Sequence, residues 1–64
     1  MFILLTVPEN RPVFVNTALI TVLTDSGDKT KVYFTGGEED YIVVTESLED
    51  IYERIQSAEK RYRK

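Results

Sequence analysis

The hydrophobic residues of this 64-residue chain gather in five short runs, which are rich in β-branched and large apolar side chains. Short runs of this composition are typical of β-strands. Prolines, glycines and small polar residues separate the runs, and these residue types favour turns. The pattern predicts strands at about residues 2–7, 12–15, 19–24, 30–35 and 41–45.

Two connecting segments carry specific turn signals. The side chain of Asn16 can accept hydrogen bonds from backbone amides further along the chain, so residues 16–18 are expected to form a single turn. Residues 25–29 are expected to form a hairpin loop in which Gly27 takes the left-handed conformation, because glycine adopts a positive φ without steric cost.

The C-terminal segment shows a helical period instead. Ser47 can cap the free amides of a helix N-terminus, and Glu49 and Asp50 stand where carboxylates favour the positive end of the helix dipole. The pattern predicts a helix over about residues 48–61. Its apolar stripe consists of Leu48, Ile51, Tyr52, Ile55, Ala58 and Tyr62.

Together these elements predict an α+β fold, in which a small antiparallel sheet of four or five strands carries one C-terminal amphipathic helix packed on one face. Ile51 and Ile55 are expected to anchor that helix on the sheet. We expect residues 1–64 to form a single domain, because a chain of this length buries only about 60% of the surface that its unfolded form exposes.

The alternation of side chains places apolar residues on both faces of the predicted sheet. In the first strand, Phe2 and Leu4 share one face with Thr6, whereas Ile3 and Leu5 point to the other. Later strands repeat the pattern, since Leu19 and Leu23 oppose Ile20 and Val22, and Tyr41 and Val43 oppose Ile42 and Val44.

One helix is too narrow to cover both faces, so the remaining apolar surface needs a second cover. Either the sheet curls until its two halves pack on each other, or a second copy of the chain covers the open face. Leaving about six to eight large apolar side chains in water would exceed the patch usual on a monomer. We favour the second copy, and the sequence then predicts a homo-oligomer formed through the second apolar face.

The composition excludes several classes of chemistry. Cysteine and histidine are absent from the sequence, so it offers no disulfide, no thiolate or imidazole metal ligand and no Cys or His nucleophile system. The carboxylates at Asp25 and Asp28 and at residues 38–40 lack the ligand spacing of a calcium loop and are interpreted as solvated turns. We therefore expect no catalytic residue, no metal and no cofactor, and a protein that is not an enzyme.

Charge is distributed unevenly along the chain. Residues 1–50 contain three basic and nine acidic side chains, whereas residues 51–64 contain five basic and two acidic ones. An acidic body is a poor surface for phosphate, so nucleic acid is an unlikely partner. No apolar run approaches the roughly 20 residues that span a bilayer, and the N-terminal run lacks the basic flank of a signal peptide, so we expect a cytoplasmic protein without membrane contact.

Two groups of side chains are candidates for contact with an unknown protein partner. Tyr33 and Tyr41 flank the acidic loop and can stack with a base or a peptide, although cross-strand packing of the two rings is the favoured interpretation. The basic C-terminal cluster can contact nucleic acid or an acidic partner, although a solvated helix end that complements the negative end of the helix dipole is the favoured interpretation. Its members are Lys60, Arg61, Arg63 and Lys64.

A series of short motifs covers most of the chain: Pro-Val-Phe-Val-Asn at residues 12–16, Ile20, Gly-Gly at 36–37, Tyr-Ile-Val-Val at 41–44, and Thr-Glu-Ser-Leu-Glu-Asp-Ile at 45–51. The series resembles the small bacterial FlbD-like proteins linked to flagella and swarming. This resemblance implies a hairpin-rich fold with a closing helix and a role without catalysis. The positions that correspond best are Asn16, Ile20, Glu46 and Ser47.

Residues 11–55 also resemble LytTR-type DNA-binding domains, in which short strands carry an Asn-then-Ile turn and end in a Ser-Leu-Glu helix start such as residues 47–49. Domains of that type bind DNA through exposed loop residues. The loops here are mostly acidic, so the resemblance supports the fold more than the activity. We therefore expect a self-associating protein-interaction module, with a regulatory DNA-binding module as the alternative.

Overall fold

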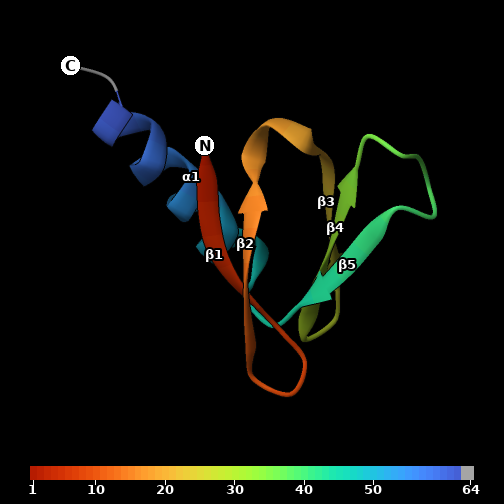
Figure 1. The fold of residues 1–64 in the computed structure, drawn as a ribbon. Coiled ribbons are helices and arrows are strands. Elements are labelled where there is room, and N and C mark those ends of the chain that lie inside the picture. The colour runs from red at the N-terminus through yellow and green to blue at the C-terminus, as the bar shows by residue number, and fades with distance from the viewer. Residues whose placement is uncertain (63–64) are drawn as a thin grey trace.

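The computed structural model describes residues 1–62, and it describes side chains up to residue 60. Figure 1 shows five strands followed by one C-terminal helix, which confirms the predicted α+β class. The elements in chain order are β1 (Phe2–Val7), β2 (Arg11–Asn16), the short 3₁₀ helix η1 (Thr17–Leu19), β3 (Ile20–Ser26), β4 (Lys29–Phe34), β5 (Tyr41–Val44) and α1 (Leu48–Tyr62).

The strands form two antiparallel sheets instead of the one sheet predicted. β1 pairs with β2, and β4 lies between β3 and β5. The two sheets meet at one end, where the Thr45 amide donates a 2.8 Å hydrogen bond to the Thr6 carbonyl. Figure 1 shows β1 and β5 approaching each other there and diverging toward their other ends. Side-chain alternation indicates which face a residue takes, but it carries no information on which strands pair, so the division was not predictable from it.

The β1–β2 and β3–β4 turns use residues with a positive φ. In the β1–β2 turn, Glu9 and Asn10 have φ values of 74° and 61°. The β3–β4 turn is shorter than the predicted loop of residues 25–29, because Ser26 pairs directly with Lys29. Gly27 has a φ of 81°, as expected, and stands first in a two-residue turn. A positive φ at that position is the pattern of a type II′ turn, whose twist suits antiparallel strands.

A β-bulge in β3 changes the predicted assignment of faces. The register shifts between Ile20 and Val22, which leaves Thr21 as an extra residue opposite β4. The Thr21 hydroxyl donates to the Tyr33 carbonyl at 3.3 Å. As a result Ile20 and Leu23, which strict alternation set on opposite faces, both pack against the core.

The core lies between the inner faces of the two sheets and one side of α1. Ser47 caps α1, since its hydroxyl accepts a hydrogen bond from the Asp50 amide at 3.1 Å. Ile51 is fully buried, and Ile55 and Ala58 pack beside it, which confirms the predicted anchors of the helix. The buried apolar residues are Ile3, Leu5, Val15, Val32, Val44 and Ile51.

For the inner apolar faces the structure shows the curled arrangement, which we did not favour, whereas cover by a second copy stays a prediction for the outer faces. Both sheets contribute buried side chains to a single cluster, so the inner faces cover each other within one chain. The outer faces receive no such cover from the residues that the structure describes, and several of their large apolar side chains remain exposed.

Candidate interaction surface

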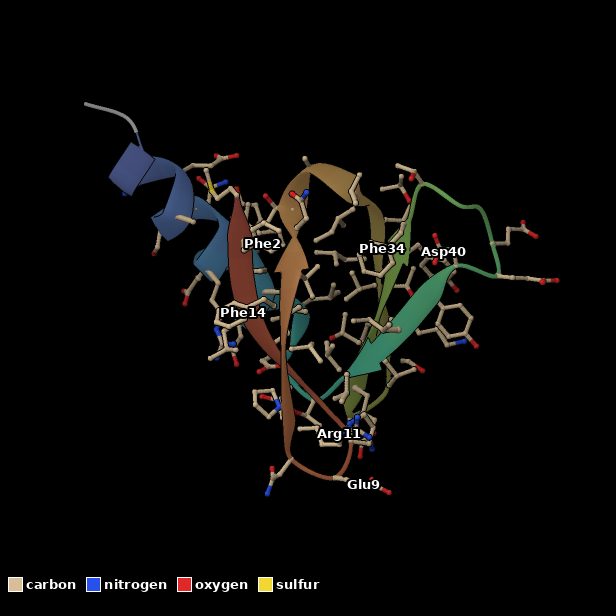
Figure 2. All side chains as sticks on the ribbon, viewed as in Figure 1. Phe2, Glu9, Arg11, Phe14, Phe34 and Asp40 are labelled. Carbon is tan, nitrogen blue, oxygen red and sulfur yellow. The ribbon has the colours of Figure 1, made fainter. Side chains whose placement is uncertain are left out.

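The outer face of the β1–β2 hairpin exposes three large apolar side chains. Phe2, Leu4 and Phe14 are 61%, 46% and 73% exposed. Leu4 stands directly opposite Phe14, and Phe2 lies two residues from Leu4 on the same face. Figure 2 shows Phe2 and Phe14 on this hairpin, with Phe34 across the molecule in the other sheet. We call the cluster of Phe2, Leu4 and Phe14 the hairpin face.

The hairpin face has no charged neighbour on its own strands. Side chains of β1 and β2 that point to the same side are Thr6, Pro12 and Asn16, which are uncharged. A surface of this composition differs from an ordinary solvated sheet face, where charged and polar residues alternate with buried ones. It has the aromatic enrichment and the depletion of charge that mark the centre of protein interfaces.

The free edge of β1 is closed over its second half by residues from far along the chain. The Thr6 amide donates to a Glu46 carboxylate oxygen at 2.9 Å, and the Thr6 carbonyl accepts from the Thr45 amide. The Arg54 guanidinium donates to the Leu4 carbonyl at 2.6 Å. Side chains that occupy edge groups in this way prevent another strand from pairing there.

Glu46 connects three elements through a single residue. Its carboxylate accepts from the Thr6 amide in β1 and from Arg54 in α1, the latter at 3.1 Å, while its carbonyl accepts from the buried hydroxyl of Thr30 in β4 at 2.8 Å. The Glu46 side chain is only 9% exposed, whereas Arg54 reaches solvent. These bonds hold the segment between β5 and α1 against the first sheet.

The ionisation of Glu46 reflects the same contacts. Burial of the carboxylate raises its pKa, but hydrogen bonds from the Thr6 amide and hydroxyl, from its own amide and from Arg54 outweigh that effect. The pKa of Glu46 is therefore held below its ordinary value of 4.5. The carboxylate stays charged in neutral solution and keeps its acceptor role.

An open groove runs between β1 and α1 beside this closed edge. Its volume is about 670 Å³, and the hairpin-face residues Phe2 and Leu4 form part of its wall. Asp50 and Glu53 line the helix side together with Arg54, so the groove holds more negative than positive charge. Among residues 1–62, no group of three or more Asp and Glu side chains comes together in a way that could hold a metal ion.

Tyr33 and Tyr41 stand opposite each other in the β4–β5 register. Their ring centroids are 5.3 Å apart with an interplanar angle of 43°, and the Lys31 ammonium lies 5.1 Å from the Tyr41 ring centre. These are the distances of a cross-strand aromatic pair and a cation–π contact. The two tyrosine rings therefore pack against each other within the three-stranded sheet.

The structure places Lys60, the described member of the basic cluster, away from these tyrosines. Lys60 lies near the C-terminal end of α1, which Figure 1 shows on the opposite side of the molecule from β4 and β5. The Arg61 side chain, Arg63 and Lys64 lie outside what the structure describes. The six predicted partner-binding residues thus do not form one surface over the part of the chain that is described.

The acidic turns have local contacts of their own. Asp40 accepts a hydrogen bond from the Gly36 amide at 3.1 Å and thereby closes the loop between β4 and β5. Asp28 forms an exposed ion pair with its neighbour Lys29 at 3.6 Å. Both contacts fit the interpretation of these carboxylates as turn residues.

Comparison with known proteins places the chain in no family: no family model, no curated protein and no solved structure matches it. The resemblances to FlbD-like proteins and to LytTR-type domains therefore stay predictions. Within residues 1–62, no helix combines the length and the apolar content that crossing a membrane requires.

Two features of this surface escaped the sequence interpretation. The first is the role of Phe14, although the proline two residues earlier gave a signal, because proline within a strand marks a sheet edge. The second is the Glu46–Arg54 pair, whose contacts with β1 join residues 40 and 50 positions apart. No local spacing rule connects residues so distant in the chain.

Proposed function

We propose that this chain is a non-enzymatic, cytoplasmic protein-interaction module that self-associates through the hairpin face. The observation that carries the proposal is the exposure of Phe14, an aromatic side chain 73% open to water and flanked by Leu4 and Phe2. Large aromatic side chains are enriched at the centre of protein interfaces, where a few residues carry most of the binding energy.

The energetics favour a weak and concentration-dependent association. A phenylalanine side chain buries about 150–250 Å² when it is fully covered, so the hairpin face offers on the order of 300 Å² of apolar surface. Complete burial of that area on both copies would be worth about 15 kcal/mol. Association itself costs about 4–15 kcal/mol in lost motion. The difference is about 0–11 kcal/mol, and its middle value of about 5 kcal/mol corresponds to a dimer dissociation constant on the order of 0.1 mM.

The proposal agrees with the resemblance to FlbD-like bacterial proteins, which implies a role without catalysis. The LytTR-like alternative would require cations on the DNA-facing loops, and the loop at residues 36–40 is acidic instead. A fluorescence anisotropy titration with random duplex DNA at low salt discriminates between the two functions. We expect no binding by about 50 µM, and saturable binding below that concentration would favour the DNA-binding module.

Sedimentation equilibrium across about 1 µM to 1 mM tests the proposal directly. The wild-type chain is expected to shift from monomer to dimer in this range, and Phe14→Ser is expected to remain monomeric. The matched control is Val22→Ser, because Val22 is a similarly exposed strand residue on the outer face of the other sheet. A wild-type chain that stays at 7.4 kDa throughout would refute self-association.

A further inference from the structure

Within the described part of the chain, the outer edge of β2 has no partner strand, whereas Glu46, Thr45 and Arg54 occupy the second half of the β1 edge. The pairs Leu4–Phe14 and Thr6–Pro12 alternate with Leu5–Val13 along the register. The amide and carbonyl of Thr6 bond to Glu46 and Thr45, away from β2, and Pro12 has no amide hydrogen. Thr6–Pro12 and Leu4–Phe14 are therefore non-hydrogen-bonded pairs, whose backbone groups point to the two outer edges of the hairpin.

The backbone groups on the β2 edge are those of Pro12, Phe14 and Asn16. Within residues 1–62, β2 pairs with β1 alone, and no hydrogen bond reaches the amide or carbonyl of Phe14. The corresponding groups on the β1 edge are occupied at the Leu4 carbonyl and at both groups of Thr6. The fold closes one edge of the hairpin and leaves the other open.

We infer that two copies of this chain join by antiparallel pairing of β2 with β2, with the two-fold axis at Phe14. The inference rests on the self-association proposed above. Of the hairpin face, it brings only the two Phe14 side chains together, because Phe2 and Leu4 stand on β1, away from the paired edge. In this register Phe14 exchanges both of its backbone hydrogen bonds with Phe14 of the second copy. Each Asn16 amide donates to the Pro12 carbonyl across the axis. The two hairpins then form one continuous four-stranded sheet.

Pro12 suits this register because it stands opposite Asn16. Asn16 is the N-cap of η1, and the carbonyl of an N-cap residue already accepts the first bond of the helical turn. The donor that proline lacks is therefore not needed at that position. A shift of two residues in one direction would set Pro12 opposite Phe14, whose carbonyl would then have no donor, so the proline disfavours that register.

The side chains and charges of β2 are compatible with a two-fold axis at Phe14. The two Phe14 residues would lie about 5.5 Å apart at their Cα atoms, on one face, as a cross-strand aromatic pair. Val13 would stand opposite Val15 of the second copy on the inner side. Arg11 is the one charged residue of β2, and the two-fold axis places the two Arg11 side chains at opposite ends of the interface. No like charges meet across the axis.

Amide hydrogen exchange, read residue by residue by NMR, tests the geometry on the unmodified chain. The amides of Phe14 and Asn16 are expected to exchange at least about tenfold more slowly at concentrations that favour the dimer than in dilute solution. The amides of Phe2 and Leu4, which point to the β1 edge, serve as the internal control and are expected to change little.

The possible outcomes distinguish β2–β2 pairing from the self-association on which it rests. A dimer whose Phe14 amide stays unprotected would overturn edge pairing while leaving self-association through the hairpin face intact. Protection of Leu4 instead of Phe14 would assign the interface to the β1 edge and also overturn the inference. A chain that remains monomeric at about 1 mM would overturn both.

A pair of substitutions at one position provides the second test. Asn16 has a φ of −78°, which proline can adopt, so Asn16→Pro removes the amide donor without distorting the strand. Asn16→Ala is the matched control, because it also loses the cap that the Asn16 carboxamide provides to the Ala18 amide but keeps the donor. We expect Asn16→Pro to weaken the dimer at least about tenfold relative to Asn16→Ala. Equal dimer affinities for the two folded variants would contradict the pairing.

Discussion

The outer faces of the two sheets contain apolar residues in similar positions but expose different kinds of side chain. On the three-stranded sheet, Tyr33 and Tyr41 pack on each other and Lys31 lies over the Tyr41 ring. Their polar ends can reach water while their apolar parts cover one another. On the hairpin, Phe2 and Phe14 have no polar end and no covering neighbour of that kind.

The difference indicates that an apolar residue on an outer strand face is informative only together with its cross-strand neighbours. Val22 is half exposed and stands beside Tyr33, which has an amphipathic partner of its own. Phe14 stands beside Leu4, and both are exposed. Tyr33 thus has its packing partner within the same chain. The exposed side chains of Leu4 and Phe14 gain stability when another surface covers them.

The largest expected effect is the difference in unfolding free energy between a substitution on the inner face of the hairpin and one on its outer face. Leu5 is fully buried, whereas its neighbour Leu4 is 46% exposed. Leu5→Ala should lower the free energy of unfolding by about 2–5 kcal/mol, because it removes buried contacts and leaves a cavity. Leu4→Ala should cost less than about 1 kcal/mol in the monomer. Urea denaturation at low protein concentration measures both, and similar losses would contradict the assignment of faces.

The next effect concerns the residue that links the two sheets. The folded pKa of Glu46 lies below 4.5, so the carboxylate binds a proton less readily in the folded chain than in the unfolded chain. Its stabilisation is therefore complete above the unfolded pKa and is lost as the pH falls through the lowered folded pKa. Thermal melts should show constant stability from about pH 7 to pH 5 and a decline below that range.

Substitution at the same residue isolates its share of the acid response. Glu46→Gln keeps an acceptor for the Thr6 amide but loses the charge opposite Arg54, and it should cost about 1–2 kcal/mol at neutral pH. The decline in stability on acidification should also become shallower than in the wild type. Glu53→Gln is the control, since Glu53 is an exposed carboxylate on α1 beside Arg54. Equal acid responses in both variants would exclude Glu46 as their source.

The smallest effect sharpens the contrast between the outer faces. A double-mutant cycle with Tyr33→Leu and Tyr41→Leu should give a coupling energy of about 0.5–1.5 kcal/mol in urea denaturation. Neither substitution should change the sedimentation behaviour of the chain. A loss of self-association in either variant would move the interface from the hairpin to the three-stranded sheet.

Several parts of the fold follow from patterns between near neighbours in the sequence. The strand runs, the left-handed conformation of Gly27 and the capping of α1 by Ser47 all depend on residues within a few positions of each other. The shared face of Ile3 and Leu5 also follows from a period of two along a single strand, whereas the tertiary structure decides that this face is the inner one. Such patterns act through local geometry, so they can be interpreted without knowing the rest of the fold.

Other features depend on contacts between distant parts of the chain. The division into two sheets depends on which strands pair, and the bulge at Thr21 reverses the local alternation that the sequence pattern implies. The closure of the β1 edge joins Thr6 to Glu46 and Leu4 to Arg54. Residues that are far apart in sequence meet only after the chain has folded, because their approach is set by the packing of whole elements. The open edge at Phe14 is a consequence of that packing.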